Sequence, residues 1–171
     1  MDGGLRFFEV ANEAIDSNKE GDATHPSTEA IWDSVLGQGF ELYGVATDDA
    51  HHYDDAARVR AEGGLAHVGD RGFVMVRAER DGDAIRSALE RGDFYASNGL
   101  LLTDVRREGD VLRIDAPEDV TVTFIGDGGR TLATGTGRSA SIDLRAAASS
   151  YVRARVLDAR GRTAWIQPHR P

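Results

Sequence analysis

Residues 150–161, SYVRARVLDARG, decide the fold of the second half of this chain. Aromatic or basic residues alternate there with aliphatic ones: Tyr151, Arg153 and Arg155 on one side, Val152, Ala154 and Val156 on the other. A period of two residues is that of a β-strand with one buried face. We therefore expect a strand of an antiparallel sheet, with the first set of side chains in water and the second set buried.

The same rhythm continues outward from this stretch over residues 99–171. Short alternating runs such as DVLRIDA, DVTVTFIGDGG and RTAWIQP are separated by turns that include EGD, GDGG and ARGR. Strands that recur about every 8 to 12 residues are typical of an antiparallel sandwich. We predict a small β-sandwich domain over residues 99–171.

Residues 1–98 have a different pattern, in which apolar strands alternate with helices. The segments LRFFEVA (5–11) and ELYGVAT (41–47) predict buried strands, and Ser27 or Thr28 can cap the helix between them. A polar, glycine-rich excursion or lid (54–72) precedes a buried strand at 73–78 and a helix at 82–92 with Ile85, Ala88 and Leu89 inward. The expected class of this half is α/β.

The two halves also differ in net charge, and the charge limits the kinds of partner that we expect. Residues 1–98 carry 9 basic and 20 acidic side chains, a balance of −11, whereas residues 99–171 carry 11 and 9, a balance of +2. An acidic surface repels phosphate backbones, so we expect no nucleic-acid partner. No apolar run approaches the roughly 20 residues of a membrane span, and we expect a cytoplasmic protein without a membrane partner. With no cysteine, any metal must use nitrogen and oxygen ligands.

The stretch GVATDDAHHY (44–53) places carboxylates and imidazoles directly after the second predicted strand. In an extended segment, Asp49 and His51 would point to the same side and could converge on one cation, such as zinc, manganese or iron. A cation would also relieve the repulsion between Asp48 and Asp49. The alternative is a polar loop in which Asp48 caps the next segment and His52 is solvated.

The order of motifs resembles the C-terminal region of the PHP (polymerase and histidinol phosphatase) superfamily of metal-dependent phosphoesterases, in the branch whose barrel is followed by a small β-sandwich. The matching pieces span nearly the whole chain: FFEVAN, IWDSVLGQGFELYGVATDDAHHY, GFVMVRAE, AIRSALERGDFYASNG and YVRARVLDARGRTAWIQP. The resemblance implies a fold of partial PHP-type (β/α) barrel units over residues 1–98, followed by the sandwich.

The resemblance also implies site residues and chemistry. Asp49 and His51 match the family's final D-x-H metal-ligand pair, in a site where a metal-activated hydroxide attacks a small phosphoester. Asp48, His52 and Glu9 are candidates for positions that support the ligands or face the substrate. His25, His67 and His169 match no ligand motif, and we expect them to be surface or packing residues.

The family's H-x-H pair is absent from this sequence, so most metal ligands are missing from the chain. Two ligands seldom hold zinc firmly. An open part-barrel also exposes strand edges, which association would cover. We expect an incomplete phosphoesterase that associates with a second copy or with a separate N-terminal half. The alternative is a noncatalytic binding or interaction module built on the sandwich, with the barrel remnant as scaffold.

Overall fold

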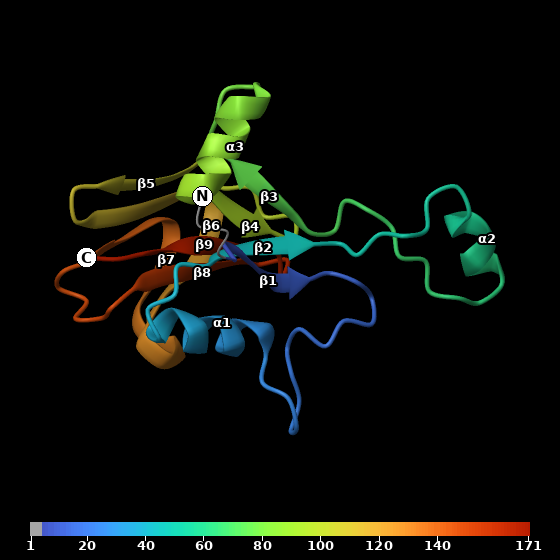
Figure 1. The fold of residues 1–171 in the computed structure, drawn as a ribbon, viewed down its shortest axis with the longest axis horizontal. Helices are drawn as coiled ribbons and strands as arrows, with labels where there is room; N and C mark the ends of the chain where they lie inside the picture. The colour runs from blue at the N-terminus through green and yellow to red at the C-terminus, as the bar shows by residue number, and fades with distance from the viewer. Residues whose placement is uncertain (1–4) are drawn as a thin grey trace.

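The computed structural model, which describes residues 5–171, contains two β-sheets (Figure 1). The smaller sheet is a parallel pair of β1 (Phe7–Asn12) and β2 (Tyr43–Thr47). The larger sheet has seven strands, and all of its pairs are antiparallel. The fold is therefore mixed α/β with mostly β content.

The large sheet has the strand order β3-β4-β9-β8-β6-β5, and β7 pairs with β6. Its strands, in chain order, are β3 (Phe73–Val76), β4 (Phe94–Ser97), β5 (Asp104–Glu108), β6 (Val111–Gly126), β7 (Arg130–Asp143), β8 (Val152–Asp158) and β9 (Thr163–His169), with a short 3-10 turn, η1 (Asp127–Gly129), between β6 and β7. Antiparallel pairing agrees with the sequence-based prediction. The prediction of a two-sheet sandwich is corrected, because the strands form one hydrogen-bonded sheet.

The sheet is interrupted within β6, where the register of its pairing with β7 shifts between Asp115 and Val120. Pro117 lies in this interval, and proline has no N–H to donate to a neighbouring strand. Before the shift β6 pairs with β5, and after it with β8. Buried residues from both parts of β6, including Ile114 and Phe124, belong to one core. We expected two sheets to enclose this core. In the structure a single sheet, interrupted within β6, encloses it.

The large sheet also continues across the expected boundary between residues 98 and 99. Tyr95 and Ala96 of β4 pair with Ile166 and Trp165 of β9. Strand β3 then pairs with β4 at the edge of the sheet. The last strands of the first half are therefore hydrogen-bonded to the end of the chain.

Helices α1 and α3 begin at residues whose side chains cap them. Helix α1 (Thr28–Gly37) starts at Ser27, whose hydroxyl accepts a hydrogen bond from the Ala30 N–H at 3.2 Å. Helix α3 (Gly82–Arg91) is capped by the Asp81 side chain and ends at Gly92, which has a φ of 76°.

Two expectations about α3 and β3 are wrong. Ala88 of α3 is fully buried, but Ile85 is 39% exposed, because the helix packs mainly on the short edge strand β3. Strand β3 itself is not buried: Met75 is 38% exposed. An edge strand has a neighbour on one side only, so its side chains are less covered than the apolar sequence suggests.

The solvated face predicted for β8 is also wrong at two of three positions. Tyr151 and Arg153 are 0% and 1% exposed, and of the predicted set Arg155 alone is exposed. Helix α1 supplies the covering residue: Arg153 donates two hydrogen bonds of 2.7 Å to the carboxylate of Asp33. The alternation predicts the strand, but both faces are buried at its start, and exposure on one face begins only at Arg155.

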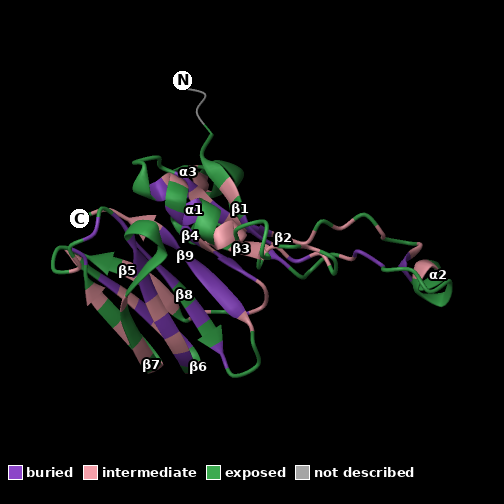
Figure 2. Cartoon of the chain, turned by 90° about the horizontal axis from the view of Figure 1, so that it is seen from below, coloured by how far each residue is buried: buried purple, intermediate pink, exposed green. Residues whose placement is uncertain are grey.

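Residues 48–72 project from the body as a long arm that carries the short helix α2 (Ala56–Ala61), as Figures 1 and 2 show. The base of the arm is closely packed, since a Cβ added at Gly72 would lie 2.3 Å from the carbonyl oxygen of Thr47. The excursion predicted from the glycine-rich sequence is present. Within residues 5–171, no helix is long and apolar enough to cross a membrane.

Candidate functional site

The stretch DDAHH begins directly after β2, at the carboxyl end of the parallel pair. Asn12 and Thr47 are register partners, so β1 and β2 end together, and the Glu13 N–H donates to the Thr47 carbonyl at 2.8 Å. The carboxyl ends of parallel strands are where α/β folds build their sites. The loop therefore lies at the carboxyl end of a parallel strand, as the sequence indicated.

The loop is not extended, contrary to the expectation for Asp49 and His51. Asp49 has a φ of 51°, a left-handed conformation that aspartate tolerates better than most residues. The turn brings the His51 ring back onto the chain, and its Nδ1 lies 2.8 Å from the Asp49 carbonyl oxygen. Both residues are exposed.

This contact makes His51 Nδ1 a donor, because a carbonyl oxygen can only accept. In the neutral ring that tautomer has its lone pair on Nε2. Metal-ligating histidines characteristically donate their other ring N–H to a carbonyl or a carboxylate, which fixes the tautomer. The Nδ1 contact of His51 is of this kind.

Asp48 and Glu9 have structural contacts. The Asp48 carboxylate accepts from the Ala50 N–H at 3.2 Å and from the Asp70 N–H at 2.9 Å, so it holds the two sides of the arm together at its base. The Glu9 carboxylate accepts a hydrogen bond from the Thr47 hydroxyl. These contacts suit residues that support the loop.

Three histidines gather on the arm. The ring of His51 lies 4.6 Å from that of His52 and 4.5 Å from that of His67, and the His52 and His67 rings are 5.7 Å apart. The backbone N–H groups of His51 and His52 both donate to the His67 carbonyl, at 3.2 and 2.9 Å. In return the His67 N–H donates to His52 Nδ1 at 3.1 Å, so His52 Nδ1 is an acceptor.

We expected His67 to be a surface or packing residue, and its side chain is largely covered, with 9% of the residue exposed. Its Nδ1 is buried and has no hydrogen-bond partner within the described residues, while its Nε2 lies 3.7 Å from an Asp16 oxygen. Leaving a buried polar atom unpaired costs about 1–3 kcal/mol. Nothing in the sequence around His67 indicates its neighbours, because the closure of the arm brings together residues 15 positions apart.

The donor types suit a divalent metal, but their number and arrangement do not complete a site. In the described part of the chain, residues 5–171, no group of three or more His, Asp or Glu side chains could hold an ion. The rings of His51 and His67 are stacked, with 19° between their planes. Because nitrogen lone pairs lie in the ring plane, two nearly parallel rings cannot direct them at one ion. The described residues therefore do not complete a metal site, and of the predicted pair both Asp49 and His51 are exposed side chains.

Comparisons of the chain with protein-family models, with curated proteins and with solved structures gave no match.

Proposed function

We propose that this chain supplies the Asp49–His51 corner of a divalent-metal phosphoesterase site of the PHP type, and that further ligands come from another polypeptide segment. The proposed fold of residues 1–98 is accordingly a set of partial barrel units, in which β1 and β2 are neighbouring barrel strands. Zinc, manganese or iron would suit one carboxylate and one imidazole. When bound, such a metal supplies Lewis-acid chemistry and activates water for phosphoester cleavage.

The observation that carries the proposal is the position of His51 and the contact of its Nδ1. It lies in the loop that follows a parallel strand, and its Nδ1–H is held by the Asp49 carbonyl at 2.8 Å, which in the neutral ring leaves the lone pair on Nε2. Asp48, Glu9 and His52 then have supporting roles: Asp48 and Glu9 fix the loop, and His52 presents Nε2–H, because its Nδ1 accepts from His67.

The missing ligands require a partner, either a second copy of this chain or a separate N-terminal half. The edge of β1 supports this proposal, because β1 pairs only with β2 within the described chain. Phe7 is 39% exposed on that strand, and Leu5, just before it, is 76% exposed. An unpaired parallel edge with apolar neighbours is a surface that association covers.

Elemental analysis of the purified protein tests the proposal, with the oligomeric state recorded on the same samples. We expect near-stoichiometric zinc, manganese or iron in associated protein, and its loss in the variant His51→Ala. The control is His25→Ala, because the His25 side chain is 73% exposed and belongs to another loop. Metal content that is equal in both variants, or a monodisperse monomer without metal, would contradict the proposal.

A noncatalytic binding module is the second candidate, and one observation favours it. Fewer than three suitable donors are arranged for a metal among residues 5–171, whereas protein sites use three or four for zinc. An upstream reading frame that carries an H-x-H pair would favour the phosphoesterase. A partner that binds the chain equally well after removal of metal would favour the module.

A further inference from the structure

A groove of about 580 Å³ opens on the large sheet between β5 on one side and β3, β4 and β9 on the other. We call it the β5 groove. Its apolar walls are formed by Met75, Phe94, Tyr95, Leu102, Val105 and Ile166. The volume is within the range of pockets that hold small molecules, about 300–1,000 Å³.

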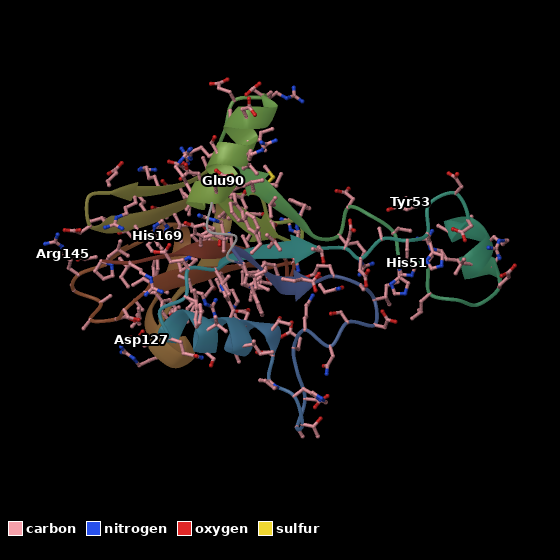
Figure 3. All side chains as sticks on the ribbon, viewed as in Figure 1. His51, Tyr53, Glu90, Asp127, Arg145 and His169 are labelled. Atoms are coloured by element: carbon pink, nitrogen blue, oxygen red, sulfur yellow. The ribbon has the colours of Figure 1, made fainter. Side chains whose placement is uncertain are left out.

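The β5 groove is separate from the candidate metal loop. His169 lines the groove at the end of β9, while Figure 3 shows His51 out on the arm, near α2, and His169 on the body. A ligand in the groove therefore does not depend on the proposed metal site.

The charges that line the groove do not cancel. Arg77 and Arg106 both bond the Asp104 carboxylate, so three of the charges form one cluster. Asp93 also lines the groove, and it pairs with Arg91 at 2.8 Å.

Arg107 shares the Asp110 carboxylate with Arg145, which is closer to it, at 2.9 Å against 3.7 Å. The Arg107 Nε and Nη1 donate to the carbonyl oxygens of Gly109 and Arg170, both at 2.8 Å, so the charge of Arg107 is only partly neutralised.

His169 lies on the other wall of the groove, and its pKa is affected by the charge of Arg107. Burial and the Arg107 guanidinium lower the pKa of His169 to about 4. The imidazole is therefore neutral at pH 7, and it keeps one N–H to donate. Within residues 5–171 its ring nitrogens make no hydrogen bond. A neutral donor and a guanidinium with free N–H groups thus face one apolar space.

We propose that the β5 groove binds a small molecule with one carboxylate on a flat apolar body of one or two rings. The carboxylate lies on Arg107 and accepts from His169, and the rings lie against Tyr95 and Ile166, which are register partners on one face of the sheet. The planar fork of a guanidinium matches a carboxylate in two-point hydrogen bonding. A guanidinium that is only partly neutralised suits a monoanion, and the aromatic ring of Tyr95 suits a planar body.

The test is a titration of the full chain with 2-naphthoate and, in parallel, with its neutral analogue 2-naphthamide, followed by amide chemical shifts in two-dimensional NMR. We expect saturable shifts at residues 94–95, 102–107 and 166–169. The amide should bind at least about tenfold more weakly, because it lacks the charge that pairs with the guanidinium. Equal affinity of the two compounds, or shifts in another part of the chain, would overturn the proposal.

Two variants place the ligand within the groove. Arg107→Gln should weaken naphthoate binding at least about fivefold while leaving naphthamide binding unchanged. Met75→Trp, on the opposite wall, should weaken both compounds by filling space, and it tests the site even where Arg107→Gln disturbs the fold. Arg138→Gln is the control, since its side chain is 73% exposed on β7. Naphthoate binding that survives both groove variants would also overturn the proposal.

Discussion

The junction between α1 and β8 and the projecting arm use the same types of charged residue in opposite ways. In the junction, the Arg153 side chain is 1% exposed and binds Asp33 at 2.7 Å and Glu29 at 2.8 Å, with Trp32 against its guanidinium at 5.1 Å. In the arm, the ion pairs of Arg58 with Asp55 and Glu62 lie between side chains that are 43–61% exposed. Charges in the junction are fully paired inside the protein, and charges in the arm are in water.

The pKa values in the junction follow from this pairing. Burial alone would raise the pKa of Glu29, but the charge of Arg153 and a hydrogen bond from Trp165 lower it. Burial alone would lower the pKa of Arg153, but hydrogen bonds to Asp33 and the charge of Glu29 raise it. Glu29 and Arg153 therefore stay ionised. The comparison teaches that paired charges here join α1 to the sheet, whereas the exposed polar groups around Asp49 and His51 are free for a ligand.

The largest expected effect comes from breaking the junction. Arg153→Ala removes the only cation that contacts Asp33 in the described chain and leaves a buried carboxylate unpaired. Loss of one partner of a buried pair costs about 3–5 kcal/mol, and we expect that decrease in the free energy of unfolding from urea denaturation. The control is Arg155→Ala on the same strand, whose side chain is 47% exposed and should contribute less than about 1 kcal/mol. Equal decreases in the free energy of unfolding for Arg153→Ala and Arg155→Ala would contradict the difference between buried and exposed ion pairs.

A pH titration extends the comparison to the groove, where His169 is partly buried and its ring makes no hydrogen bond within residues 5–171. Its pKa is lowered from 6.5 to about 4, so between these values the unfolded chain binds more protons. His169 therefore stabilises the fold above about pH 6.5, and this contribution is lost as the pH falls toward 4. Its size is on the order of 3 kcal/mol, at 1.36 kcal/mol per pKa unit. We expect the free energy of unfolding of His169→Gln to fall less over this range than that of the wild type, and parallel curves would contradict it.

A smaller effect is expected when the Tyr151 hydroxyl is removed and the Arg153–Asp33 ion pair is kept. The Tyr151 hydroxyl donates to Asp33 Oδ1 at 2.8 Å and lies 2.9 Å from the Gly126 carbonyl oxygen. Tyr151→Phe removes this donor while Arg153 still satisfies Asp33, so we expect a loss of about 1 kcal/mol in urea denaturation. A loss as large as that of Arg153→Ala would mean that the hydroxyl, and not the ion pair, holds the junction.

The smallest effect on stability is expected from removal of the outer arm. The His52 N–H donates to the His67 carbonyl, and the His67 N–H donates to the His52 ring, so residues 53–66 can be replaced by Asn-Gly. In that segment Ala56 and Ala66 alone are buried. The free energy of unfolding should change by less than about 1 kcal/mol, because regions with few buried apolar contacts add little to global stability. A drop comparable to that of Arg153→Ala in thermal unfolding would show that the arm is part of the core.

The sequence predicts local features of this fold well, and long-range features poorly. Alternation from residue 151 to 156 predicts β8, and Ser27 predicts the start of α1, because both signals lie in neighbouring residues. The burial of Arg153 is not predicted, since Asp33, which neutralises it, lies 120 positions earlier in the chain. The continuation of the sheet from β4 to β9 escapes prediction for the same reason.

The candidate site shows the same division. The loop after β2 could be located from DDAHH, because a strand followed by clustered polar residues is a local pattern. The left-handed turn at Asp49 and the approach of His67 could not, since they depend on how the arm closes. Whether Asp49 and His51 bind a metal stays a prediction.

The most direct test of the account is sedimentation velocity of the full chain with and without Mn²⁺, for the wild type and for His51→Ala. If Asp49 and His51 form one corner of a site that a second copy completes, Mn²⁺ should shift the wild type toward a larger species, and His51→Ala should remove the shift. A shift of the same size in His51→Ala would contradict the assignment of the metal corner to this loop.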